Sequence, residues 1–486
     1  MTFAVQLRLH TSAHDEAVLN TRFNLAKHIQ NVLVKEARKC LHDLEQDHEY
    51  WHTLSLYRRE TDKLKKKEIG AQLKLLRESH GVSKSHLEQY VKVQQHMFKQ
   101  NIDSQACQKI AARVFQGVEK YLYGNGKKLN YVKEVTTICG KQNCTGIRYV
   151  KETLIWNGLK IKVNIPADNE YIIEALAYGN PKYCAVKRKM FNNGWHWYLL
   201  LTIDGIPPKK NRIISQGKVG IDIGVSTVAV CSATALILEK LAPDVRRYNR
   251  KIASIQRYMD RSKRHSNPQY YDQAGRIKKG KKHWIYSNGY RKANRQLKST
   301  YASKALYIQN CHEQLANRIL ELGDEVVVEH MNFKGLQKKA KKTERKSTPI
   351  MIKGKPVYPY KRKKHFGKSL NDRAPASLIS IIDCKLHYEE KEIHKVNPMK
   401  YRASQYHHDT NEYVKHKLHE RWKTIEGHQV QRDLYSGFLL MNCNDTYRQP
   451  DQSTCLKQFS SFLSMHTDLI QNMKNQHISC RACFGF

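Results

Sequence analysis

The chain has 486 residues, which is too long for one ordinary domain and predicts two to four domains with cores of their own. Its 85 Lys and Arg outnumber 44 Asp and Glu, and the resulting net charge of +41 predicts a polyanionic partner. A hydrophobic fraction of 40% excludes a basic disordered tail, while a ribosomal-type protein and a membrane-surface binder stay open as alternatives. The sequence has no apolar run of about 18 residues and no signal-peptide pattern, so we expect no membrane span.

The N-terminal part predicts strands that surround a group of helices. Residues 3–10 alternate apolar and polar side chains, as a half-buried strand does. From about Asn24 the apolar spacing becomes helical, and further helices are expected at 63–76, from Ser83 or Ser85, and after Ser104 as an N-cap. Strand patterns return at 146–150, 152–156, 159–165, 184–191 and 195–203. We interpret this as a β-barrel or sandwich formed by residues 1–23 and 125–212, interrupted by a helical insert at 24–124.

Beyond an expected linker at 209–212, short buried strands and basic helices alternate. Residues 218–221 form a strand pattern with Asp222 at its end, and 227–231 form its hairpin partner. Residues 245–322 are helical and very basic, 326–329 form a second buried strand that ends in Glu329, and 377–388 form a helix. Asp433 falls in the first turn of another helix. We therefore expect an α/β core at 213–383 with a basic helical insert, a further core segment at 431–445, a separate module at 384–430 and a tail at 446–486.

Basic residues interleaved with aromatic ones predict contacts to a nucleic-acid backbone and to single bases. The aromatic candidates are Trp284 and Tyr286, which lie between basic clusters of the helical insert. Five more candidates follow the Glu329 strand: Lys338, Lys339, Lys341, Lys342 and Arg345. The alternative for any one cluster is a solvated helix surface.

Asp222, Glu329 and Asp433 lie 107 and 104 residues apart, so no local structure links them. Two follow buried strands and one begins a helix, so different elements of one sheet can bring them together. Hydrolysis of a phosphodiester with two Mg²⁺ ions requires hard oxygen ligands held close together. The sequence therefore predicts that these three acids are both catalytic residues and metal ligands. Taken singly, Glu329 could be a strand-end acid paired with a lysine and Asp433 a helix N-terminal charge.

The set of motifs resembles the split RuvC nuclease core of TnpB-like transposon-encoded proteins and of compact type V CRISPR effectors. The residues that carry the resemblance are Gly220-Ile221-Asp222-Ile223-Gly224, Val327-Val328-Glu329-His330-Met331-Asn332-Phe333-Lys334-Gly335 and Arg432-Asp433-Leu434-Tyr435-Ser436, together with 366–370 and the helix that follows. The order of strand, helical insert, β-barrel and nuclease core is also similar to that family, up to about residue 442.

The resemblance implies an RNA-guided DNA endonuclease with an RNase H-like core and two Mg²⁺ ions. It also implies a wedge-like barrel with a helical recognition insert, a guide RNA and target double-stranded DNA as partners, and a location in the prokaryotic cytoplasm at the nucleoid. In such systems base pairing supplies the sequence specificity, and the protein supplies charge and shape. The alternatives are a guided DNA-binding repressor that does not cut, and an RNase H-fold transposase.

Two stretches depart from the family. Where it carries a zinc module with paired cysteines, residues 403–431 contain no cysteine, so zinc is not expected and 384–430 is interpreted as a degenerate target-binding module. The tail after Asn442 contains Cys443, Cys455, Cys480 and Cys483. We expect this tail to be loosely packed or without a role, rather than a metal site.

Overall fold

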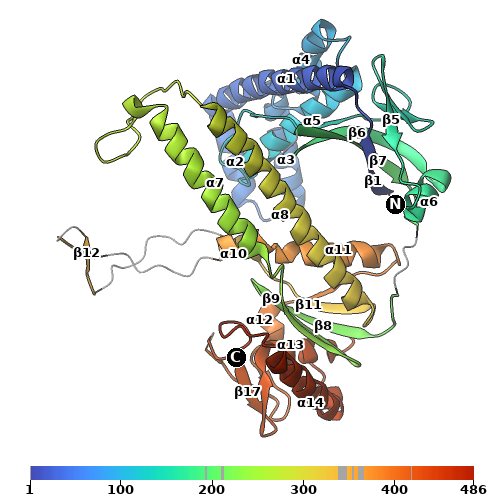
Figure 1. The fold of residues 1–486 in the computed structure, drawn as a ribbon, viewed down its shortest axis with the longest axis vertical. Helices are drawn as coiled ribbons and strands as arrows, with labels where there is room; N and C mark the ends of the chain where they lie inside the picture. Colours follow the sequence, from blue (N-terminus) through green and yellow to red (C-terminus); the bar gives the residue numbers. More distant parts are fainter. Residues whose placement is uncertain are drawn as a thin grey trace. The chain divides into compact units, whose positions relative to one another are not determined.

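The computed structural model describes residues 2–191, 194–208, 213–337, 347–352, 355–358, 366–417 and 419–486. The chain divides into two compact units, Met1–Lys210 and Asn211–Phe486 (Figure 1). The boundary falls within the expected linker at 209–212, and those four residues lie outside the described ranges. Among the helices that are described, none is long and apolar enough to cross a lipid bilayer.

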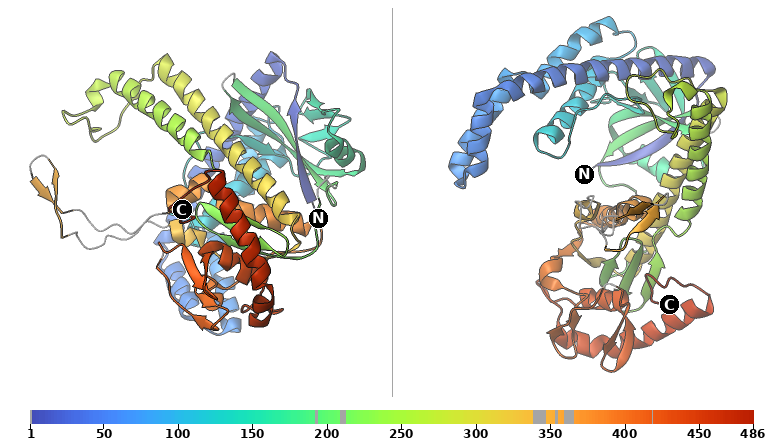
Figure 2. Two further views of the ribbon diagram at one scale, coloured as in Figure 1. Left: turned by 60° about the horizontal axis from the view of Figure 1, so that its bottom comes forward. Right: turned by 90° about the vertical axis from the view of Figure 1, so that its left-hand side faces the viewer.

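Unit 1 contains a curled antiparallel sheet with the strand order β2-β6-β7-β1-β5-β4-β3 (Figures 1 and 2). β1 lies between β7 and β5, with Val5 opposite Leu201 and Arg8 opposite Asn164. Its side chains alternate between exposed and buried, as the sequence predicts. The strands are β1 (Thr2–Leu9), β2 (Thr137–Cys139), β3 (Arg148–Val150), β4 (Thr153–Trp156), β5 (Leu159–Asn164), β6 (Asn180–Phe191) and β7 (Gly194–Asp204).

The predicted starts of the helices at 63 and near 83–85 are confirmed, whereas the first helix of unit 1 begins earlier than predicted. The expected start at Asn24 is wrong, because Ser12 and Asp15 form a capping box that begins the first helix at Ala13. Asp103, and not Ser104, caps the last long helix of the insert. The second and sixth helices were not predicted. The helices are α1 (Ala13–Gln46), α2 (His48–Arg59), α3 (Lys63–Ser79), α4 (Lys84–Met97), α5 (Ser104–Leu122) and α6 (Glu170–Tyr178).

One face of α1 packs on the sheet of unit 1. Phe23 meets Trp197 of β7 edge to face at 5.2 Å between ring centroids. The buried Arg22 donates hydrogen bonds to the carbonyl oxygens of Trp156 and Asn157 at 2.7 and 2.8 Å. A cation can be buried here because backbone oxygens replace the water that it loses.

Unit 2 is built around a mixed sheet with the strand order β10-β9-β8-β11-β14. β10, β9 and β8 are antiparallel neighbours, and β11 is parallel to both β8 and β14. These strands are β8 (Lys218–Ile223), β9 (Thr227–Ser232), β10 (Leu236–Lys240), β11 (Glu325–Glu329) and β14 (His394–Val396). Three separate two-stranded ladders are β12 (Ile350–Ile352) with β13 (Lys355–Val357), β15 (Tyr406–His407) with β16 (Glu412–Tyr413), and β17 (Trp422–Ile425) with β18 (His428–Gln431).

The crossover from the antiparallel strands to β11 is a long helical hairpin. α7 (Val245–His265) and α8 (Asn288–Leu320) run side by side (Figures 1 and 2). The expectation of helix throughout 245–322 is therefore only partly correct, since 266–287 contain one short 3₁₀ turn, Pro268–Tyr270. The other helices of unit 2 are α9 (Phe333–Gln337), α10 (Gly367–Arg373), α11 (Pro375–His387), α12 (Pro398–Tyr401), α13 (Arg432–Met441) and α14 (Gln452–Asn475).

The expectation of a loosely packed C-terminal tail is wrong. α14 contributes Cys455, Phe459 and Phe462 to a core that it shares with α13 and the sheet. Even Phe484, two residues before the last residue of the sequence, is fully buried in that core. The apolar residues of the tail thus complete unit 2.

Candidate active site

Two of the three predicted acids lie side by side at one edge of the unit 2 sheet. In the parallel pair β8 and β11, Ile221 lies opposite Val328, so the next residues, Asp222 and Glu329, are neighbours. Both acids are partly exposed, although the residues before them are fully buried. Ligand sites of sheets with parallel strands lie at this edge, beyond the carboxyl ends of the strands.

The third acid reaches the same edge because α13 lies against β8. A Cβ atom on Gly220 would lie 2.0 Å from the carbonyl oxygen of Gly437, so only glycine permits this approach. Asp433, in the first turn of α13, keeps a side chain that is 15% exposed. One turn later, the Ser436 hydroxyl hydrogen-bonds to Asp222, which joins the helix to the strand.

The negative charges of Asp433 and Glu329 act on Asp222. The pKa of Asp222 is raised well above its usual range, first by burial and then by the negative charges of Asp433 and Glu329. Burial also raises the pKa of Glu329, and a hydrogen bond from the Ala403 N–H at 3.3 Å opposes that rise. The structure therefore places the three predicted acids at one edge of the sheet, where the charges of Glu329 and Asp433 disfavour ionisation of Asp222.

This donor set fits Mg²⁺, which prefers carboxylate oxygens in a site that water can reach. Carboxylates from β8, β11 and α13 lie at one edge of the sheet and each is partly exposed, although their oxygens do not all lie within 4.8 Å of one another. The repulsion that raises the pKa of Asp222 is the interaction that a bound divalent cation would relieve.

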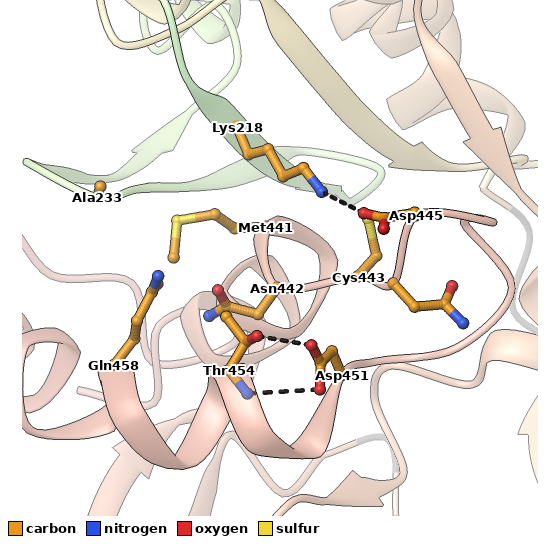
Figure 3. Close-up of a pocket in the computed structure, with 10 residues that line it drawn as sticks. Lys218, Ala233, Met441, Asn442, Cys443, Asp445, Asp451, Thr454 and Gln458 are labelled. Atoms are coloured by element: carbon orange, nitrogen blue, oxygen red, sulfur yellow. Dashed lines mark hydrogen bonds and ion pairs between the residues drawn. The ribbon is translucent and has the colours of Figure 1, made fainter.

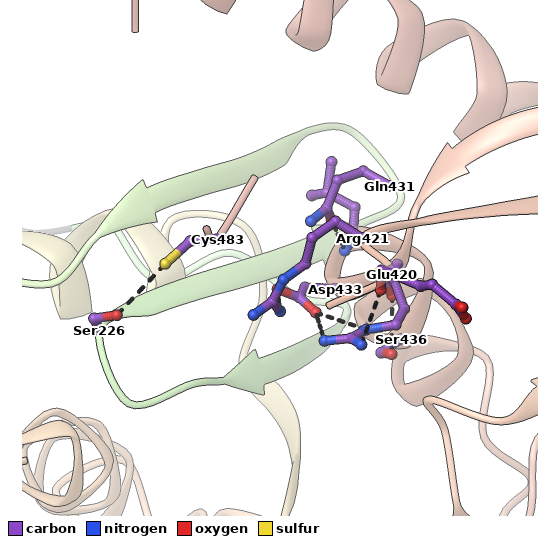
Figure 4. A network of polar contacts seen from close by, with 9 residues as sticks. Ser226, Glu420, Arg421, Gln431, Asp433, Ser436 and Cys483 are labelled. Carbon is purple, nitrogen blue, oxygen red and sulfur yellow. Dashed lines mark hydrogen bonds and ion pairs between the residues drawn. The ribbon is translucent and has the colours of Figure 1, made fainter. Parts of the chain in front are cut away.

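Two arginines on Asp433 were missed by the sequence analysis. Arg432 donates from Nε and Nη2 to Oδ1 of Asp433, at 3.2 and 3.1 Å. Arg421, just before β17, donates from Nη1 to Oδ2 at 3.4 Å (Figure 4). The adjacency of Arg432 and Asp433 could have suggested the first contact, but nothing in the sequence points to the second. Each carboxylate oxygen of Asp433 thus faces a guanidinium group, which fixes its orientation.

The α7–α8 hairpin presents the predicted basic surface. The apolar residues of α7, Ile255 and Met259 among them, pack on Ala293 of α8. The basic side chains of α7 point away from this contact and are exposed at Arg246, Arg247, Arg250, Lys251, Arg257, Arg261 and Arg264. One face of the hairpin therefore carries a dense positive charge, as a phosphate-binding surface requires.

The two predicted aromatic residues lie in the segment that connects α7 to α8. Trp284 is partly exposed, meets Tyr270 edge to face at 5.2 Å and lies 3.6 Å below the Lys263 ammonium group. Tyr286 stacks on Tyr290 at 4.4 Å. Both predicted aromatic side chains thus pack against another aromatic ring of the protein. The predicted Lys338, Lys339, Lys341, Lys342 and Arg345 lie outside the described residues.

A polar cavity at the other end of β8 is separate from the acids. Its lining includes Lys218, the first residue of that strand, and Asp445, whose carboxylate lies 3.8 Å from the Lys218 ammonium group (Figure 3). Because Asp222 lies at the opposite end of β8, this cavity is not part of the candidate active site.

Comparisons with known proteins give no family assignment. No protein-family model matches the chain, and no curated protein is significantly similar to it in sequence. Among solved structures, a Cas12f1–sgRNA–target DNA complex matches with 13% identity and a TM-score of 0.43, over 91% of this chain and 99% of that one. A CRISPR-Cas12f ternary complex matches with 13% identity and a TM-score of 0.27, over 89% and 86%. Scores this low describe weak similarity, so function has to be inferred from this chain's own residues.

Proposed function

We propose that this protein is an RNA-guided DNA endonuclease that hydrolyses phosphodiester bonds with Mg²⁺ at Asp222, Glu329 and Asp433. The observation that carries the proposal is the convergence of three carboxylates from β8, β11 and α13, which the sequence separates by more than a hundred residues each. A structural acid needs one partner, whereas three acids held together destabilise the free protein and call for a cation.

Each acid has a separate part in this proposal. Bound Mg²⁺ supplies Lewis-acid activation of water and charge stabilisation at the leaving oxygen. Asp222 and Glu329 provide oxygen ligands from two adjacent strands, so their spacing is set by the sheet. Asp433 provides a third ligand from α13, and Arg421 and Arg432 hold its carboxylate in one orientation.

The charge distribution supports a guide RNA and a target DNA as the partners. A net charge of +41 is far more than solubility needs, and the exposed arginines of α7 concentrate part of it on one face. In guided recognition the protein follows the backbone of the heteroduplex and base pairing reads the sequence. The neighbouring Cas12f structures contain RNA and DNA, which agrees with this proposal without carrying it.

A guided DNA-binding protein that does not cut is the second candidate, and the presence of all three acids argues against it. A transposase with a three-acid core is the third. The cleavage assay below separates them, since a transposase joins DNA ends, and a binding protein leaves the plasmid intact.

The test uses the full-length protein with the RNA that co-purifies with it. Sequencing this RNA gives the guide, and a plasmid that carries the matching target is then incubated with the complex and Mg²⁺. We expect cleavage by the wild type and a loss of about 100-fold or more in rate for Asp222→Ala, because several kcal/mol of transition-state stabilisation disappear with the metal. Asp445→Asn is the matched control, since this exposed acid lies by the other end of β8.

Binding has to be measured beside cleavage. Asp222→Ala that binds target as tightly as the wild type but does not cut supports the assignment, whereas cleavage at the normal rate by this variant contradicts it. A wild-type complex that binds the matching plasmid and never cuts it would make the binding-only function correct.

Nucleic-acid affinity should depend steeply on salt. Each phosphate neutralised by the basic surface releases a counterion, so log K falls linearly with log salt with a slope of about 0.9 per contact. We expect a loss of about 10³-fold or more between 50 and 200 mM salt in filter binding, for six or more contacts. An affinity that does not change over this range would contradict a role of the α7 arginines in binding.

A further inference from the structure

Glu36, Cys40 and His86 form a compact cluster in the helices of unit 1. Glu36 and Cys40 are four residues apart on α1, so both point from one face of that helix. His86 lies in the first turn of α4, where its backbone N–H donates to the Ser83 hydroxyl at 3.1 Å. The cap fixes the start of α4 and thereby aims the imidazole at α1.

The three potential ligand atoms form a nearly equilateral triangle. Cys40 Sγ lies 3.7 Å from His86 Nε2 and 3.6 Å from Glu36 Oε1. His86 Nε2 lies 3.3 Å from the same Glu36 oxygen. In a tetrahedral zinc site, bonds of about 2.3 Å to sulfur and about 2.0–2.1 Å to nitrogen and oxygen place the ligands about 3.3–3.6 Å apart. The triangle therefore has the dimensions of one face of a zinc tetrahedron.

Gly81 lies against the cluster, and part of the cluster is exposed to solvent. Gly81, in the turn before α4, has φ +70°, and a Cβ atom there would lie 3.2 Å from both the Cys40 sulfur and the His86 ring. Cys40 is 6% exposed, whereas the His86 side chain is 35% exposed. The cluster is thus closed on the side of α1 and open to solvent at the imidazole.

We propose that Glu36, Cys40 and His86 bind one Zn²⁺ ion that joins α1 to α4, with a water molecule as the fourth ligand. The combination of one thiolate, one imidazole and one carboxylate favours Zn²⁺ over the Mg²⁺ proposed for unit 2. The Cys40 thiol releases its proton to solvent when the ion binds. This site is independent of the proposed nuclease, and the paired-cysteine rule could not find it because it uses a single cysteine.

Cobalt reports on the site directly. The full-length protein is stripped with a chelator, exchanged into buffer without metal, and titrated with Co²⁺, which gives visible bands in a tetrahedral site and a near-ultraviolet thiolate band. We expect saturation at one Co²⁺ per chain and complete displacement by Zn²⁺. Cys40→Ser should abolish the thiolate band, and His86→Gln should abolish binding at equimolar metal.

Matched variants separate this site from the other cysteines. Cys144→Ser removes an exposed cysteine of unit 1, and the double variant Cys480→Ser/Cys483→Ser removes the closely spaced pair of unit 2. Both should bind Co²⁺ like the wild type. A thiolate band that persists in Cys40→Ser, or disappears in either control, would overturn the proposal.

The effect of Zn²⁺ on the thermal midpoint provides a second test that does not require Cys40→Ser to fold. Zn²⁺ should raise the thermal midpoint of the wild type and leave that of His86→Gln unchanged, while far-ultraviolet circular dichroism shows the variant to be folded. His86 is partly exposed, so this variant carries the test even where Cys40→Ser does not fold. If the stripped wild type binds no Co²⁺, the triangle is a hydrogen-bonded cluster and the proposal is wrong.

Discussion

The sheets of the two units differ in where their strands carry exposed polar side chains. In unit 1, β1 alternates exposed and buried residues along its whole length, so one face of the sheet accepts polar groups. In unit 2, every residue of β9 is buried, and the residues of β8 and β11 that are not buried lie at or next to the strand ends. A sheet covered on both faces can carry a carboxylate only where a strand ends.

This difference explains why strand-end acids are informative in unit 2. Val326, Val327 and Val328 are buried, and Glu329 directly after them reaches solvent. An acid in such a position is next to other strand ends, so acids from several strands can share one cation. In unit 1 a charged residue after an apolar one recurs along β5, with Lys160 and Lys162 exposed, and indicates only the exposed face. The predictions below test whether the stability of unit 2 is more sensitive to changes at buried positions than the stability of unit 1 is to changes at exposed positions.

The largest loss of stability is expected from Asp372→Ala. Asp372 accepts a hydrogen bond from the buried Lys304 ammonium group at 2.6 Å, and Asn249 accepts another at 2.9 Å. Removal of the acid leaves a buried charge unpaired, which costs about 3–5 kcal/mol in free energy of unfolding. Urea denaturation measures the loss, and the double variant Lys304→Met/Asp372→Leu should recover most of it. A single variant as stable as the wild type would contradict this account of the buried charge.

Gly220→Ala should cost about 3 kcal/mol or more, because its Cβ would overlap the backbone of α13. Gly158→Ala in unit 1 is the matched control. A Cβ on Gly158 meets no atom within 4 Å, and only its φ of +78° opposes alanine. About 1 kcal/mol is expected there. Equal losses at the two positions would show that the close approach of α13 to β8 is not what stabilises unit 2.

Asp222→Asn should stabilise the metal-free protein. Burial and two neighbouring acids raise the pKa of Asp222, so its ionisation in the folded state costs stability as the pH rises above the unfolded-state pKa. The thermal midpoint in chelator should therefore be higher for the variant at pH 8, and the difference should shrink toward pH 4. A variant less stable than the wild type at pH 8 would contradict the crowding of the three acids.

The smallest effect is expected from Ser12→Ala. Its hydroxyl accepts a hydrogen bond from the Asp15 N–H at 3.1 Å and begins α1. Loss of an N-cap costs about 1 kcal/mol. Circular dichroism with urea can measure it, and Ser12→Asp, which keeps an acceptor, should retain most of the stability. A loss above that of Gly220→Ala would reverse the comparison of the two units.

Periodicity predicted the elements whose apolar pattern is local. The strands at 3–10 and 326–329 and the helix with Asp433 were found in this way, because each carries its own pattern. The start of α1 was missed since it depends on one capping box, and the break at 266–287 was missed because basic residues continue through it. The role of α14 was missed because its apolar residues, Phe459 among them, follow the last motif and their partners lie elsewhere in the chain.

The candidate site was predictable only in part. Asp222, Glu329 and Asp433 could be found because each marks the start or end of an element. Arg421 could not, since it reaches Asp433 through the β17–β18 ladder. The cluster of unit 1 was also invisible, because Glu36 and His86 are 50 residues apart and only the packing of α1 on α4 brings them together.

Because Phe484 is part of the core of unit 2, this core can be completed only after unit 1 has been synthesised. Unit 1 draws its sheet from residues up to Asp204, so all its strands are synthesised well before α13 and α14. Unit 2 lacks part of its core until Phe484 has been synthesised, and Asp222 on β8 and Glu329 on β11 precede Asp433 on α13 by more than a hundred residues. A nascent or truncated chain that lacks α13 thus contains every strand of unit 1 but only two of the three carboxylates, so under the proposed function it could not cut DNA.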